Sequence, residues 1–315
     1  MKTLYIGNSY FAEKDKQDVL DEYVPCKPTG FFKRNLILKP ASKLSLYSII
    51  ELFFTDWKKK VSDYEQIIIA ENSYVKNIDL AELRVAKKLA PNAKIVYWFR
   101  NTYADQEMKS KINKVKKYTS DIYTFDKIQS EKFQIKYNTQ NFPTKIMERD
   151  FLTQDKYDIS IVASLKDRGS SYLKIIKYAK ENNLNLFAAI VIKRFKKLPD
   201  RLLELDPFVH KKFLSKEEYD FIIANSKATI DFYQSGQEGE TLRVFEATLL
   251  KKKIITNNSN LKKLPFYNSN NFFFFGEQDI SELKKFINSP YDENIGDTLS
   301  YYELKNWLRR FELHV

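Results

Sequence analysis

Residues Tyr233 to Asn258 read YQSGQEGETLRVFEATLLKKKIITNN and carry the clearest indication of the fold class. This stretch opens with a polar turn that holds two of the chain's seven glycines. Apolar side chains then recur with the i, i+3, i+7 spacing of one face of an amphipathic helix, at Leu242, Phe245 and Leu249. The apolar run at 254–256 predicts a short buried strand. A polar turn, a helix and a strand in this order make half of a nucleotide-binding α/β unit.

The polar turn lies at the N-terminus of the predicted helix, where unpaired N–H groups and the helix dipole favour an anion such as a phosphate. Thr241 stands at the capping position, and Arg243 lies in the first turn. An arginine there opposes the helix dipole, so its presence favours an anionic neighbour. Glu246 follows one turn later, within reach of the same ligand. A plain surface helix that begins with a glycine turn remains the alternative.

The turn and helix also resemble the donor-site signature of bacterial capsule and lipopolysaccharide glycosyltransferases with the two-domain GT-B fold. The resemblance is carried by the string Gln237-x-Gly239-x-Thr241-x-Arg243-x-x-Glu246. In that family the glycine turn faces the diphosphate of the donor, and the glutamate holds the nucleotide ribose. The resemblance therefore implies that Arg243 faces phosphate and Glu246 faces ribose hydroxyls. It also implies donor-binding roles for Gln237, Gly239, Glu240 and Thr241.

Apolar runs separated by helical segments fill the first half of the chain, at 4–6, 67–70, 94–99 and 122–125. The run at 67–70 is apolar throughout, which is typical of a strand buried on both faces of a parallel sheet. This rhythm predicts a doubly wound sheet. Ligands of such sheets bind at the carboxyl ends of the strands, so Glu71 and Asp126, which follow two of these runs, are candidate site residues.

A second series begins with the apolar strand at 157–162, and the turn after it carries Lys166 and Arg168. The same glycosyltransferase family has a K-x-R turn after this strand. The resemblance implies that both cations face the donor diphosphate, and an ordinary solvated turn is the alternative. Further on, Ser215 and Glu218 have the spacing of a capping box, which predicts the start of a helix.

The composition is that of a folded, basic protein. The 315 residues suffice for two domains, and contents of 43% hydrophobic and 15% aromatic residues exclude a disordered chain. The net charge of +12 calls for nucleic acid, anionic lipid headgroups or a phosphorylated small substrate, unless a lysine-rich coding bias alone produces it. The sequence has no zinc-finger, basic-zipper or RNA-recognition motif, so we expect no nucleic-acid partner.

Cysteine content and the N-terminal sequence favour a cytoplasmic location. Cys26 is the only cysteine, which excludes an intramolecular disulfide and a cysteine-based zinc site. The opening MKTLYIGNSYF enters a strand pattern at once and has no signal-peptide character. The longest apolar runs fall far short of the roughly 20 residues that span a bilayer. We expect a cytoplasmic protein, and peripheral association with the cytoplasmic face of the inner membrane stays open.

The resemblance implies an α/β protein with the GT-B fold, in which two Rossmann-like doubly wound domains face a central cleft. On this basis residues 1–150 form the N-terminal, acceptor-side domain, and residues 151–295 form the nucleotide-sugar donor domain. The amphipathic pattern at 301–313 predicts a C-terminal helix within 296–315. In GT-B proteins such a helix crosses back and braces the N-terminal domain.

The leading hypothesis is a glycosyltransferase that moves a sugar from a UDP- or GDP-linked donor to a lipid-linked or oligosaccharide acceptor during surface-polysaccharide assembly. Because no D-x-D triad lies in a fitting loop, we expect Arg243, Lys166, Arg168 and the helix N-terminus to stabilise the leaving diphosphate without a metal or a cofactor. An inverting reaction needs a base, for which Glu71 and Asp126 are the candidates, whereas a retaining reaction needs none. The alternative is a non-catalytic nucleotide-sugar-binding or scaffold protein with a GT-B-like cleft.

Overall fold

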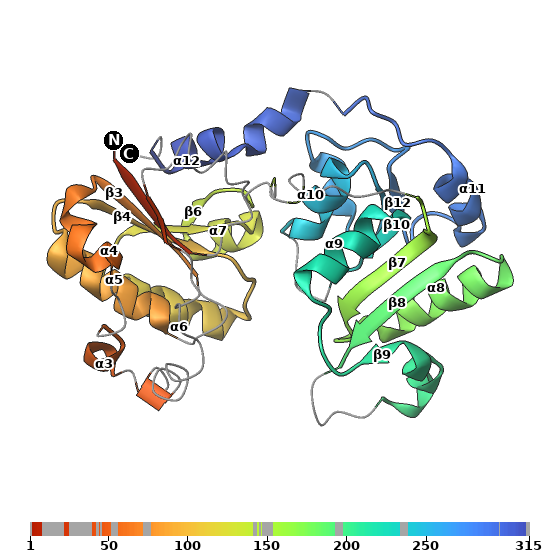
Figure 1. Cartoon of the computed structure of the whole chain (residues 1–315), viewed down its shortest axis with the longest axis horizontal. Coiled ribbons are helices and arrows are strands. Elements are labelled where there is room, and N and C mark those ends of the chain that lie inside the picture. Colours follow the sequence, from red (N-terminus) through yellow and green to blue (C-terminus); the bar gives the residue numbers. More distant parts are fainter. Residues whose placement is uncertain are drawn as a thin grey trace. The chain divides into compact units, whose positions relative to one another are not determined.

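The computed structural model describes residues 2–7, 22–24, 40–41, 44, 46–51, 56–71, 77–140, 144, 146, 154–192, 198–233, 239–295 and 297–312. The chain divides into two compact units (Figure 1). The first comprises Met1–Phe142 together with Tyr301–Val315, and the second comprises Pro143–Ser300. In the described residues each unit contains one six-stranded sheet, and helices follow the strands along the chain.

The sheet of the first unit has the strand order β2-β1-β3-β4-β5-β6, and every neighbouring pair is parallel. Its strands are β1 (Thr3–Ile6), β2 (Glu22–Val24), β3 (Gln66–Ala70), β4 (Lys94–Phe99), β5 (Asp121–Thr124) and β6 (Lys136–Tyr137). The helices between them are α3 (Tyr47–Glu51), α4 (Asp56–Lys60), η1 (Val61–Asp63), α5 (Ile78–Leu89), α6 (Asp105–Val115) and α7 (Lys127–Phe133).

The sheet of the second unit has the order β12-β11-β10-β7-β8-β9 and is also parallel throughout. Its strands are β7 (Tyr157–Ser164), β8 (Leu186–Val191), β9 (Val209–His210), β10 (Ser226–Asp231), β11 (Lys253–Thr256) and β12 (Phe272–Phe274). Its helices are α8 (Gly169–Glu181), η3 (Asp200–Phe208), α9 (Lys216–Ala224), α10 (Leu242–Leu249), η4 (Ser259–Lys263), η5 (Ile280–Glu282) and α11 (Leu283–Asn288). The predicted α/β class is confirmed, and the GT-B arrangement of domains about a cleft stays a prediction.

Burial on both faces explains why the run at 67–70 within β3 is apolar throughout. Ile67 and Ile69 pack into the core formed with α5 and α6, whereas Ile68 and Ala70 point to the opposite face. Successive side chains of a strand alternate between faces, so only an unbroken apolar run satisfies both cores. The apolar run alone is therefore enough to predict this strand from the sequence.

The second face of this sheet is covered by α12 (Leu304–Glu312), which follows η6 (Asp297–Tyr302) and lies across the sheet from α5 and α6 (Figure 1). Trp307 is fully buried, and its ring meets Trp98 edge-on at a centroid distance of 4.8 Å. Its indole N–H donates to the carbonyl of Thr139 at 2.8 Å. The last described helix is thus part of the core of the first unit.

Candidate functional site

The site predicted from the sequence lies at the carboxyl edge of the second sheet. Ser164, Asp231 and Thr256 end the neighbouring strands β7, β10 and β11, and α10 begins after the connection that leaves β10. The carboxyl ends of parallel strands lie on one edge, so the N-terminus of α10 lies there too. Gly239 is buried and Glu240 is half-buried just before the helix, and Gln237 lies outside the described residues.

The N-terminus of α10 is not capped by the side chain that the sequence places there. Thr241 occupies the capping position, but its hydroxyl donates to Asp231 Oδ2 at 2.8 Å instead of accepting from the helix. Its own N–H donates to the Tyr233 hydroxyl at 3.2 Å. The first N–H groups of a helix have no partner within the helix. The Val244 N–H of α10 donates to the Thr241 carbonyl at 3.2 Å. In the described part of the chain, the N–H groups of Leu242 and Arg243 therefore remain available to an anion at the sheet edge.

Arg243 points into the second unit and binds protein acceptors. Its Nη1 donates to Asp231 Oδ1 and to the Ile230 carbonyl, both at 3.1 Å, and its Nη2 donates to the Val162 carbonyl at 2.6 Å. Burial lowers the pKa of Arg243, but Tyr219 and Asp231 outweigh that effect and raise it. Its Nε is buried without a hydrogen-bond partner in the described part of the chain. Arg243 therefore ties α10 to β7 and β10, and its phosphate contact stays a prediction.

Arg168 has a similar arrangement at the same edge. Its Nη1 donates to the Phe232 carbonyl and its Nη2 to the Ser164 carbonyl, each at 2.6 Å. Lys166 is exposed in the β7–α8 turn and adopts a left-handed backbone with φ 42°, a conformation uncommon outside glycine. Of the two cations in the predicted K-x-R turn, Arg168 thus holds the ends of two strands together, while Lys166 lies at the surface.

Glu246 is almost fully buried between α9 and α10. Its Oε1 accepts from Lys216 Nζ at 3.0 Å, and its Oε2 accepts from the Tyr219 hydroxyl at 2.7 Å. Lys216 also pairs with the buried Asp220. A sequence motif marks Glu246 as a site residue, whereas no motif marks Lys216 or Tyr219. The capping box locates α9 correctly, yet nothing in its sequence shows that this face of α9 meets α10.

In the first unit, Glu71 lies at the carboxyl end of β3 and accepts four hydrogen bonds. The donors are the Arg100 N–H at 3.2 Å, Asn101 Nδ2 at 3.1 Å, the Tyr103 hydroxyl at 2.5 Å and Lys111 Nζ at 3.1 Å. All four come from the loop after β4 or from α6. Burial, followed by the charge of Glu71, raises the pKa of Tyr103 above its usual range. Glu71 thus anchors this loop.

Asp126, the second predicted base, is the N-cap of α7. Its Oδ1 accepts from the Gln129 N–H at 3.0 Å, and its Oδ2 accepts from the Thr102 hydroxyl at 3.5 Å. β4 separates β3 from β5 in the sheet, so the loop after β4 contacts both predicted bases. These contacts explain the positions of the Glu71 and Asp126 carboxylates as acceptors of hydrogen bonds within the protein. The assignment of either residue as a base stays a prediction.

A pair of buried acids on α5 was not found from the sequence. Asp79 accepts from the Tyr97 hydroxyl, and Glu82, one turn later, has an Oε2 without a hydrogen-bond partner in the described part of the chain. Burial raises the pKa of Asp79 from its ordinary 3.8 to about 6 and raises the pKa of Glu82 well above its usual range. An exposed carboxyl at the start of a helix is ordinary, so only the tertiary packing reveals this pair.

Replacing Asp79 by asparagine should stabilise the protein near pH 7.5 and have little effect near pH 4. Because its folded pKa is about 6, against 3.8 for the ordinary group, the folded state holds an extra proton in this window. The unfolding free energy of the wild type therefore falls as the pH rises through the window, by up to ~3 kcal/mol. Asparagine still accepts from Tyr97 but does not ionise.

Urea unfolding at both pH values checks this expectation. Asp63→Asn, which neutralises an exposed carboxyl of the same unit, is the matched control and should change the unfolding free energy by less than about 0.5 kcal/mol. A gain for Asp79→Asn that is the same at both pH values would show that ionisation is not its cause.

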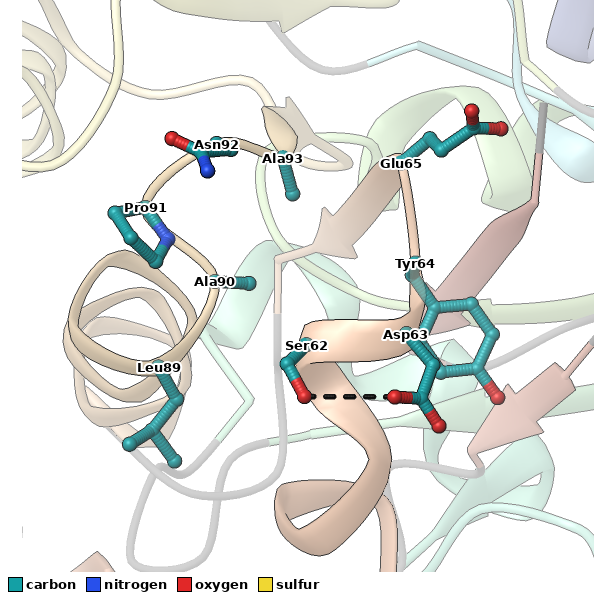
Figure 2. Close-up of a pocket in the computed structure, with 9 residues that line it drawn as sticks. All are labelled: Ser62, Asp63, Tyr64, Glu65, Leu89, Ala90, Pro91, Asn92 and Ala93. Atoms are coloured by element: carbon teal, nitrogen blue, oxygen red, sulfur yellow. Dashed lines mark hydrogen bonds between the residues drawn. The ribbon is translucent and has the colours of Figure 1, made fainter.

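A pocket of about 460 Å³ lies elsewhere, among residues 62–65 and 89–93 (Figure 2). These segments directly precede β3 and β4, so the pocket is at the amino edge of the first sheet. It contains none of the residues predicted from the sequence to form the site.

Among the described residues, no group of three or more His, Cys, Asp or Glu side chains is arranged to hold a metal ion. In the same residues, no helix combines the length and apolar character needed to cross a membrane.

The chain is similar in fold to a solved structure. No protein-family model and no curated protein sequence matches the chain. Among solved structures, it is similar to AviGT4, a glycosyltransferase involved in avilamycin A biosynthesis, with a TM-score of 0.56 and 10% identity over 99% of this chain and 96% of that one. A Glycosylation Associate Protein complex from Streptococcus agalactiae gives a TM-score of 0.40 and 13% identity, over 84% of this chain and 53% of that one. This chain therefore shares the α/β architecture of a glycosyltransferase over nearly its whole length.

Proposed function

We propose that this protein is a GT-B glycosyltransferase of bacterial capsule or lipopolysaccharide assembly, which transfers a sugar from a UDP- or GDP-linked donor to a lipid-linked or oligosaccharide acceptor. The observation that carries the proposal is the N-terminus of α10, which lies uncapped by Thr241 at the carboxyl edge of the second sheet. This is where the sequence signature places the donor diphosphate. The similarity of fold to a glycosyltransferase supports the same conclusion.

In this proposal the second unit binds the donor and the first unit binds the acceptor. The N–H groups and dipole of α10 face the leaving diphosphate, and the exposed Lys166 adds positive charge at the same edge. Arg168 and Arg243 hold the carboxyl ends of β7 and β10 together next to this site through hydrogen bonds to backbone carbonyls. A metal ion is not required, because these groups supply the charge that opposes the developing anion.

If the acceptor is lipid-linked and not a free oligosaccharide, the reaction takes place at the cytoplasmic face of the inner membrane. A lipid-linked acceptor is held there, and a net charge of +12 favours approach to anionic headgroups. Membrane association in this proposal is peripheral and electrostatic. It should weaken as salt screens the charges over a Debye length of about 8 Å at physiological ionic strength.

A non-catalytic nucleotide-sugar-binding protein is the second candidate, and one observation favours it. Glu71 and Asp126 are both engaged by protein donors, so neither carboxylate is ready to activate an acceptor hydroxyl. A retaining transferase needs no such base and fits the same observation. Release of free sugar or of UDP from a UDP-sugar, or of GDP from a GDP-sugar, would exclude the non-catalytic protein.

UDP or GDP should raise the melting temperature of the purified protein, with or without magnesium, whereas CMP and dTDP should not. A ligand at about 100 times its dissociation constant adds roughly 2.7 kcal/mol, which differential scanning fluorimetry detects. Lys166→Gln should weaken this stabilisation while leaving the unliganded melting temperature unchanged, because the side chain is exposed. Lys212→Gln, another exposed lysine of the second unit, is the matched control. Absence of a response to all four nucleotides would overturn the proposed function.

A further inference from the structure

Two side chains of α9 fix the carboxylate of Glu246 on α10. The Tyr219 hydroxyl donates to one carboxylate oxygen at 2.7 Å, and Lys216 Nζ donates to the other at 3.0 Å. The Glu246 side chain is only 6% exposed. Donors on both oxygens leave the plane of the carboxylate little freedom to rotate, so its orientation is set by α9 and not by solvent.

The electrostatics of this cluster keep both donors protonated. Burial, and then the charge of Glu246, raises the pKa of Tyr219 well above its usual range, although Arg243 acts in the opposite direction. Burial lowers the pKa of Lys216, but Glu246 and Asp220 outweigh that effect and raise it. Tyr219 and Lys216 therefore stay hydrogen-bond donors at neutral pH, and the carboxylate of Glu246 is held as an acceptor.

The carboxylate keeps acceptor capacity after these bonds are made. An ionised carboxylate offers about four lone-pair positions, and the described residues occupy one on each oxygen. Counting the described residues alone, one position remains on each of the two oxygens, which Lys216 and Tyr219 hold in place. Two fixed acceptors suit two adjacent hydroxyl groups, and a nearly buried acceptor rejects a ligand that lacks one of them.

We propose that Tyr219 and Lys216 are positioning residues that orient Glu246 toward the two hydroxyls of the nucleotide ribose. This inference rests on the proposed function, which brings the nucleotide to α10. It assigns the preference for ribonucleotides over deoxynucleotides to a contact between α9 and α10, because neither Tyr219 nor Lys216 belongs to the signature around Glu246. A buried ion pair that serves stability alone would give the same contacts but no such preference.

The test compares the affinities of UDP and 2′-deoxy-UDP, and of GDP and 2′-deoxy-GDP, by isothermal titration calorimetry. The wild type should prefer the ribonucleotide. Tyr219→Phe should reduce this preference about tenfold, with an unchanged affinity for the deoxynucleotide, because a hydrogen bond to a charged group is lost. Lys216→Met should also reduce the preference for the ribonucleotide. This second variant keeps the test decisive if Tyr219→Phe folds poorly. Glu246→Gln should remove most of the preference.

Tyr178→Phe is the matched control, since it removes a tyrosine hydroxyl elsewhere in the second unit. That hydroxyl donates to the Ser281 carbonyl at 3.2 Å, far along the chain from α10. The control should keep the full ribose preference. Equal losses of affinity for both nucleotides in Tyr219→Phe and Lys216→Met would overturn the positioning role and leave the proposed function intact. A wild type that binds neither nucleotide overturns both.

Discussion

Replacing Arg243 by methionine should destabilise the second unit by about 3–5 kcal/mol, since the substitution leaves Asp231 buried without its cation. The same change removes the donors to the carbonyls of Ile230 and Val162. These bonds join α10, β10 and β7, which are the elements that form the carboxyl edge. Urea unfolding followed by circular dichroism measures the loss.

The exposed Arg201 on η3 provides the matched control, because Arg201→Met removes an arginine from the surface of the same unit. Its effect should stay within about 0.5 kcal/mol. Should Arg243→Met prove equally mild and weaken nucleotide binding instead, the guanidinium acts on phosphate and not on the strand ends. Loss of nucleotide binding in Arg243→Met indicates a phosphate contact only if the variant keeps its stability, because an unfolded second unit also loses binding.

Replacing Trp307 by alanine should destabilise the first unit by about 3–5 kcal/mol. Its fully buried ring contacts Tyr5, Trp98 and Phe311 edge-on, so alanine leaves a large cavity between α12 and the sheet. The substitution also leaves the buried Thr139 carbonyl without its indole donor. Thermal or urea unfolding checks the expectation.

Phe213→Ala removes an aromatic side chain that is 67% exposed and is the control for loss of aromatic surface without a cavity. It should cost less than about 0.5 kcal/mol. A comparably small cost for Trp307→Ala would contradict the placement of α12 in the core. Arg310 strengthens that placement, because it donates to Asn138 Oδ1 at 2.7 Å and to Thr139 Oγ1 at 2.8 Å.

Local patterns in the sequence determined the class of fold. The unbroken apolar run of β3 predicts a strand buried on both faces, and Ser215 with Glu218 predicts the start of α9, where the structure has a complete capping box. The stripe at 242–249 likewise predicts α10. Each of these signals lies within a few residues, because strand alternation, helix periodicity and capping depend on neighbours in the chain.

The contacts of the polar side chains depend on packing between segments that are distant in the sequence. The sequence brought Glu71, Asp126, Arg243 and Glu246 forward as site residues, but their partners lie on other elements. Arg243 is 81 residues from Val162, and Glu71 is 40 residues from Lys111. A short polar motif specifies which groups are available, whereas long-range packing decides whether they meet a ligand or a neighbouring carbonyl. The sequence therefore predicted the fold class, the longer strands and helices and the candidate residues, but not the short strands β2, β6 and β9. Contacts between distant segments determine which candidate residues bind other groups of the protein.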